Sequence, residues 1–116
     1  MTALEVVNKK PGERLNGAID MSKKLVPGDF LDSVTSVVAA VAKSDLTTPA
    51  ALTIGTPSIN AVQFIHGKTQ KIVPPLTGVL FQITGGSSQT LYKITVTADS
   101  VRGEIVIEHM YLQGID

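Results

Sequence analysis

Apolar and polar residues alternate along most of the second half of the chain. In TLYKITVTA, residues 90–98, every second side chain from Tyr92 to Ala98 is apolar, and most of the residues between them are polar. A period of two residues indicates a half-buried β-strand, because successive side chains point to opposite faces of a sheet. The runs GVLFQI and GEIVIEHMYL repeat this alternation. Together the three runs predict one inner face, formed by Phe81, Ile83, Tyr92, Ile94, Val96, Ile105 and Ile107.

Glycines mark the reversals between these strands. Gly85 and Gly86 follow one strand and precede a short polar loop, residues 87–89. Glycine adopts positive φ without steric penalty, so the pair predicts a tight turn there. The segment ADSVRG, residues 98–103, predicts the next turn and ends in another glycine.

The run SVTSVVAAV, residues 33–41, is compatible with two structures. Val34, Val37, Val38 and Val41 follow the spacing of one helix face. The same run is rich in β-branched residues, which lose rotamer freedom in a helix and fit a pleated sheet. We favour a strand over this segment.

Short strands separated by glycine and proline turns predict an all-β protein. The expected fold is a single immunoglobulin-like antiparallel β-sandwich of about seven strands. A chain of 116 residues is the size of one domain, here residues 1–116. We expect an N-terminal arm at residues 1–12 and an inserted hairpin at about residues 62–76. The sequence has no cysteine, so the sandwich has no disulfide.

The charge balance narrows the function classes. Ten basic and ten acidic residues give a formal net charge of zero, which argues against a nucleic-acid binder with a basic face. Charged residues make up 17% of the chain against about 25% in an ordinary domain, a composition suited to packed assemblies. No apolar run reaches about 18 residues, and the start lacks a signal-peptide core. We therefore expect no membrane span and no export.

The candidates for nucleotide or metal chemistry are incomplete. GKT at residues 67–69 lacks the glycine five positions earlier, and the following QKIVPP cannot open a helix, so it does not form a phosphate-binding loop. His66 and His109 have no further ligands at a spacing that a metal would need. Asp20, Asp29 and Asp32 do not form a calcium-loop pattern.

No nucleophile is accompanied by a base. Ser87 and Ser88 lie outside any GxSxG elbow, and neither histidine has an acidic residue positioned to orient it. We therefore expect a protein that is not an enzyme and that has no metal and no cofactor.

The stretch AVQFIHGKTQKIVPPLTG, residues 61–78, places apolar residues around a basic turn. It is either an ordinary hairpin whose apolar face joins the core or a projecting hairpin that docks on a partner. Pro74 and Pro75 stiffen its exit and cannot continue a central strand. The sequence leaves both interpretations open.

Four segments occur in an order that resembles a known pattern: KPGE at 10–13, AIDMSKKL at 18–25, PGDFLDS at 27–33 and ITGGSSQTLYKITVTADSVRGEIVIE at 83–108. They resemble a group of small tailed-bacteriophage proteins, which look like immunoglobulin-like modules of the virion carried on the head or associated with tail parts. The chain departs from that pattern in two places. Arg102-Gly103 reverses the more usual order, and residues 62–76 are an insertion. The resemblance implies no enzymatic residues.

The resemblance implies a structural virion protein, assembled in the host cytoplasm, that binds capsid or head-accessory subunits and decorates or stabilises the particle. A symmetric homo-oligomer on the particle is expected. The alternative is a tail or fibre module that binds host-surface carbohydrate. We expect both chain ends and the inserted hairpin to supply the subunit contacts, and the ends to be removable without unfolding. The expected contact residues are Leu4, Val6, Val7, Phe64, Ile65, Lys68, Lys71, Ile72, Val73, Leu112 and Ile115.

Overall fold

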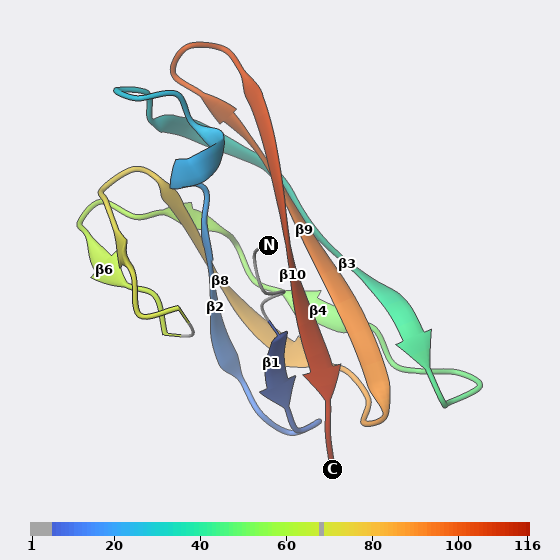
Figure 1. Ribbon diagram of the computed structural model, residues 1–116. Helices are drawn as coiled ribbons and strands as arrows, with labels where there is room; N and C mark the ends of the chain where they lie inside the picture. Colours follow the sequence, from blue (N-terminus) through green and yellow to red (C-terminus); the bar gives the residue numbers. More distant parts are fainter. Residues whose placement is uncertain (1–5, 68) are drawn as a thin grey trace.

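The computed structural model describes residues 6–67 and 69–116 and contains no α-helix in them (Figure 1). Strands account for most of this part of the chain, with one 3₁₀ turn, η1. The elements are β1 (Val6–Lys9), β2 (Leu15–Asp20), η1 (Ser22–Lys24), β3 (Leu31–Ser44), β4 (Leu52–Ile54), β5 (Ser58–Ile59), β6 (Phe64–Ile65), β7 (Ile72–Val73), β8 (Gly78–Gly85), β9 (Thr90–Ser100) and β10 (Ile105–Gly114).

Two sheets pack face to face. The first sheet has the strand order β1-β10-β9-β3, and the second has the order β2-β8-β4, with β5 also paired to β8. β1 runs parallel to β10, and the other described pairs are antiparallel. The predicted all-β sandwich is confirmed.

The core lies between the inner faces of β8 and β9. Along β9, buried and half-buried residues alternate without interruption over all 11 positions. Phe81 and Ile83 of β8 are buried against this strand, as the sequence pattern predicted. Gly17 of β2 leaves room for the Phe81 ring, because a Cβ at Gly17 would lie 2.6 Å from the ring atom Cε2. The core cluster comprises Ile19, Met21, Leu31, Val79, Phe81, Ile83, Tyr92, Ile94, Val96, Ala98, Val106, Met110 and Leu112.

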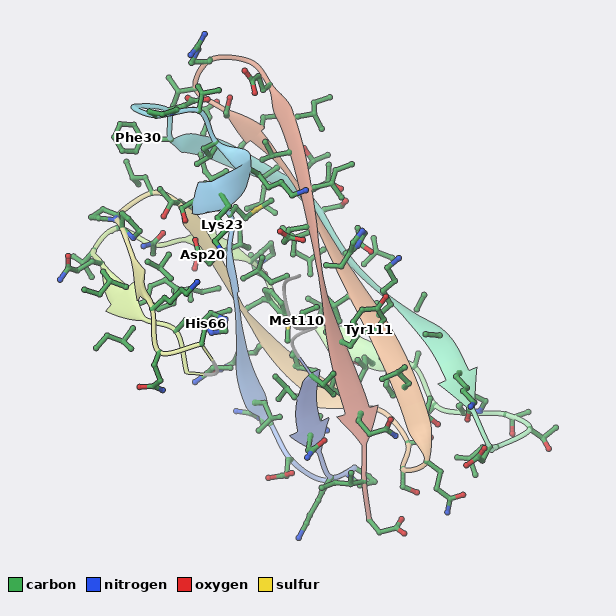
Figure 2. The ribbon with its side chains drawn as sticks, viewed as in Figure 1. Asp20, Lys23, Phe30, His66, Met110 and Tyr111 are labelled. Atoms are coloured by element: carbon green, nitrogen blue, oxygen red, sulfur yellow. The ribbon has the colours of Figure 1, made fainter. Side chains whose placement is uncertain are left out.

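The predicted inner face of the last strand is wrong. Ile105 is 69% exposed and Ile107 is 46% exposed, whereas Val106 and Met110 are buried. The turn before β10 decides this: Gly103 has a φ of 87° and its N–H donates to the carbonyl of Ser100, 2.9 Å away. This loop pairs Ile105 with an outward-facing residue of β9. Figure 2 shows Met110 on the side of β10 toward β2 and Tyr111 on the other side.

The ambiguous run at residues 33–41 is a strand, as favoured from its β-branched residues. It forms the middle of β3, which pairs with β9 along 11 residue pairs. The register shifts after Leu31, after Val34 and after Val41, so the strand carries three bulges. β3 lies at the edge of the first sheet and, among the described residues, pairs with β9 alone (Figure 1), while β4 and β5 of the second sheet lie close to it.

The chain ends are part of the sandwich, contrary to the expectation that they were free for partners. β1 pairs with β10, Val7 packs against the core and Leu112 is buried within it. Val6 and Ile115 are half-buried. Deleting residues 112–116 or residues 1–8 would therefore remove core contacts of Leu112 or Val7 and should destabilise the domain, contrary to the expectation from the sequence. Leu4 lies outside the described residues.

Two separate constraints require glycine at the end of β8, at Gly85 and Gly86. Gly85 and Gly86 have φ values of 75° and 88°, a region that side-chain-bearing residues rarely adopt. In addition, a Cβ at Gly86 would lie 2.7 Å from Cδ2 of Leu52. The turn brings the Ser87 N–H within 2.8 Å of the Tyr92 hydroxyl, which itself donates to the Ala50 carbonyl at 2.5 Å. Tyr92 thereby fixes this loop to β9, like the tyrosine corner of immunoglobulin-like sandwiches.

A buried lysine closes the same end of the sandwich. Lys9 is only 2% exposed, and its Nζ donates to the carbonyls of Lys10, Pro11 and Gly85 at 2.9, 3.3 and 2.6 Å. The bond to Gly85 joins β1 of the first sheet to β8 of the second. An ammonium group without such acceptors would be costly to bury, and its three donors match the three carbonyls.

We predict that Ile94→Ala lowers the free energy of unfolding by about 2–5 kcal/mol, because Ile94 is fully buried in the core. Ile105→Ala should change it by no more than about 0.5 kcal/mol, because that side chain faces solvent. Urea unfolding of both variants measures the difference. Equal losses for the two variants would show that the β10 register is wrong.

We also predict that Lys9→Met lowers the free energy of unfolding by about 1–3 kcal/mol, because the three carbonyls lose their charged donor. Lys10→Met is the matched control, since Lys10 is exposed and should tolerate the change. Thermal and urea unfolding compare the two variants. If Lys9→Met unfolds like Lys10→Met, the carbonyl contacts of Lys9 contribute nothing to stability.

Candidate interaction surface

The side chains considered for chemistry lie apart. Within the described residues, no group of three or more His, Cys, Asp or Glu side chains could hold a metal ion. His66 is buried beside β2, whereas His109 is exposed on β10 and lies 3.1 Å from the Thr95 hydroxyl. The Ser87 hydroxyl accepts a hydrogen bond from the Ala50 N–H at 2.7 Å, which gives it a structural partner. Asp20 accepts from the Ser22 N–H.

Asp29 connects two of the segments on which the resemblance rests. Its Oδ1 accepts hydrogen bonds from the N–H groups of Phe30 and Arg102, at 2.9 and 3.2 Å. Burial raises the pKa of Asp29, but hydrogen bonds from the Ser100 side chain and these N–H groups, and the Arg102 charge, outweigh it. The pKa of Asp29 therefore lies below its ordinary value. Asp29 thus attaches the PGDF turn to the β9–β10 turn.

The inserted hairpin β6–β7 is fixed at its base by one asparagine. The Asn60 side chain donates to the carbonyls of Val62 and Pro74 at 3.0 and 2.8 Å, and accepts from the N–H groups of Thr77 and Gly78 at 3.2 and 2.8 Å. These four bonds use the donors and acceptor of the amide fully. Both ends of the inserted segment are therefore held to β8.

A histidine fixes the hairpin farther along. Nδ1 of His66 accepts from the Thr69 N–H at 3.3 Å, so its Nε2 carries the proton and donates to the Ala18 carbonyl, 2.9 Å away. Figure 2 shows His66 between the hairpin and β2. This bond covers one carbonyl on the free edge of β2, which would otherwise be open to another strand.

The hairpin has an inner face that packs and an outer face that does not. Phe64 and Val73 lie opposite each other and pack on Gly78, where a Cβ would come within 2.9 Å of Val73 and 3.1 Å of Phe64. The other cross-strand pair, Ile65 and Ile72, is 63% and 60% exposed. The first interpretation, a hairpin whose apolar face packs on the sandwich, is therefore confirmed for the inner face. Docking of the outer face on a partner stays a prediction.

The expected contact residues on the hairpin divide accordingly. Ile65, Ile72 and Lys71 are exposed, and Val62 beside them is exposed as well. Val73 is fully buried, so its expected place in a subunit contact is wrong, because it packs on Gly78. Phe64 is half-buried on the same inner face. Lys68 lies outside the described residues.

A groove of about 450 Å³ runs between the hairpin and the outer face of the second sheet. Its walls combine apolar side chains with amide and hydroxyl groups. The residues that line it are Asn16, Gly17, Ala18, Thr56, Ser58, Phe64, Ile65, Gly67, Leu80, Phe81 and Gln82. The groove extends the exposed apolar surface of Ile65 toward the sheet.

A second recess, of about 360 Å³, lies on the first sheet, where β3 and β10 end and β9 begins. Its lining is polar, and it contains no aromatic side chain on which a sugar ring could stack. The residues that line it are Lys43, Ser44, Asp45, Gln89, Leu91 and Gln113.

No protein-family model, curated protein or solved structure matches this chain. In the described residues, no helix is long and apolar enough to cross a membrane.

Sequence reasoning missed Asn60 and Lys9. Asn60 precedes the inserted segment, and asparagine often bonds the backbone two residues on, as it does here at Val62. That tendency was the available signal. Lys9 carried no signal, because its three carbonyl partners meet only when β1 and β8 come together.

We predict that Asn60→Ala lowers the free energy of unfolding by at least about 2 kcal/mol, because the buried N–H groups of Thr77 and Gly78 lose their acceptor. Amide hydrogen exchange should accelerate across residues 61–77. Gln63→Ala, an exposed change in the same segment, is the control and should leave both measurements unchanged. Unaltered exchange in Asn60→Ala would mean that another contact holds the hairpin.

Proposed function

We propose that this protein is a structural component of a tailed-phage virion that binds other capsid or head-accessory subunits through its β6–β7 hairpin. One observation carries the proposal: the exposed pair Ile65–Ile72 on a hairpin that is fixed to the sandwich. The resemblance of four ordered segments to small virion proteins supports the virion as the setting.

The hairpin has the properties of a docking element. Burying an exposed isoleucine side chain in a contact stabilises it by up to about 1.5–3 kcal/mol, so two adjacent isoleucines suffice for a central anchor. Because Asn60 and His66 hold the hairpin in place, little conformational entropy is lost when it binds. Lys71 at its margin can contact acidic groups of a partner.

The proposal assigns the protein no chemical reaction. The hydrogen-bonding side chains described above have structural partners: Asp29 attaches one turn, His66 covers a strand edge, and Ser87 bonds the backbone. Binding through buried apolar area at many equivalent positions suits a protein of zero formal net charge.

We predict that the double variant Ile65→Asp, Ile72→Asp folds normally but is lost from purified phage particles, because each new carboxylate would be buried unpaired at the contact. Its thermal unfolding checks the fold, and quantitative gel analysis of virions counts the copies. Val101→Asp, an equally exposed site on the β9–β10 turn, is the control and should keep full occupancy. Full incorporation of the double variant would exclude the hairpin as the attachment site.

A further inference from the structure

The first sheet ends in a long edge strand. β3 spans 14 residues and pairs only with β9 in the part of the chain that the structure describes. A free edge presents a row of backbone N–H and C=O groups to solvent, and another strand can pair with it. Figure 1 shows β3 along the margin of the molecule for most of its length.

This edge lacks the usual protection against pairing. Natural edge strands carry charges, prolines or bulges that prevent a second strand from adding. Residues 33–42 of β3, SVTSVVAAVA, include no charged residue and no proline. The bulges lie toward the two ends, which leaves Ser36–Val41 as a regular segment. Val38 in its middle is 56% exposed.

The other described edges offer less. β1 and β4 have four and three residues, too few for a long ladder. His66 already occupies the Ala18 carbonyl on the edge of β2. β3 is therefore the long open edge of the described part of the chain.

Two opposite charges flank the uncharged segment and favour an antiparallel arrangement of two β3 strands. Asp32 precedes it and Lys43 follows it, and both side chains are exposed. At about 3.3 Å per residue they lie roughly 36 Å apart, too far to pair within one molecule. If two copies of β3 run antiparallel, Asp32 of each copy lies near Lys43 of the other. In a parallel pair, like charges would meet instead.

We propose that a second copy of this chain binds the β3 edge, with the two β3 strands antiparallel about a two-fold axis at Val38. Residues that oppose each other across such an axis must lie on the same face. An axis at Val38 meets this condition: it places Val38 opposite Val38 and Ser36 opposite Ala40, and it brings Asp32 next to the position opposite Lys43. The two four-stranded sheets become one continuous sheet, and the contact closes as a dimer because each copy uses its β3 edge once.

This inference does not depend on the virion proposal, because the β3 edge and the β6–β7 hairpin are separate surfaces. Each copy in the dimer keeps its hairpin free for another partner. The Ile65→Asp, Ile72→Asp variant should therefore still dimerise, so failure of one proposal is distinguishable from failure of the other.

Sedimentation equilibrium of the full chain tests the dimer. The chain mass is 12.2 kDa, so the molecular mass measured for the dimer should be 2 × 12.2, or 24.4 kDa. Asp32→Lys and Lys43→Asp should each weaken dimerisation by roughly tenfold, because each puts like charges together at both ends of the contact. The double variant exchanges the charges and should restore the parent affinity. Thermal unfolding of each charge variant as a monomer should match that of the parent monomer, which would show that the fold is intact.

Ile107→Lys supplies the matched control, since Ile107 is an exposed apolar residue on the same sheet but on β10. It should leave the dimer intact, whereas Val38→Lys should dissociate it. Because the chain has no cysteine, Val38→Cys should also form a disulfide-linked dimer under mild oxidation, and Ile107→Cys should not.

Three results would overturn the proposal. One is a parent chain that stays monomeric at roughly 100 μM, a concentration that saturates a contact of micromolar affinity. Another is a double charge variant that remains as weak as the single variants. The third is dissociation by Ile107→Lys as strong as by Val38→Lys, which would place the contact on the sheet face.

Discussion

The structure depends on the burial of one side of β9. This strand lies between β10 and β3, so its inward residues face the second sheet across the whole core. Tyr92 adds a polar connection at one end, since its hydroxyl bonds to the loop before β9 and to the segment before β4. Ile94, fully buried in the middle of the strand, would leave a cavity if truncated. Every other strand of the sandwich either pairs with β9 or packs against the residues that it buries.

Buried polar side chains then fix the loops that the core cannot hold. Lys9 joins β1 to the turn after β8, Asp29 joins the PGDF turn to the β9–β10 turn, and Asn60 holds the base of the inserted hairpin. In each case a side chain bonds the backbone of a distant segment, because loop N–H and C=O groups without a strand partner need other acceptors and donors. Rigid loops give the molecule defined outer surfaces, which the proposed docking contacts require.

Two such surfaces support different contacts. The β6–β7 hairpin presents two isoleucines beside a groove and suits attachment to a dissimilar partner. The β3 edge presents unpaired backbone between opposite charges and suits a second copy of the same chain. The two proposals together predict a dimer with two attachment points, in which simultaneous binding would raise the overall affinity above that of one hairpin.

The sequence by itself determined the sandwich and the inner faces of β8 and β9, because only one face of those strands is consistently apolar. It also indicated the glycine turn, through the glycine pair, and favoured a strand at residues 33–41, through β-branched residues that fit a pleated sheet. It did not determine the face of β10, where Ile105, Val106 and Ile107 are all apolar and either alternation fits. The turn ending in Gly103 made that choice through a hydrogen bond within the loop. The termini were misjudged for a related reason: Val7 and Leu112 enter the core only because β1 pairs with β10, a contact between residues about a hundred positions apart. The hairpin was predicted as a segment, but the packing of Phe64 and Val73 on Gly78 decided which of its faces is buried. Local alternation thus specifies a strand, whereas the register and the long-range pairing specify which side of it meets water.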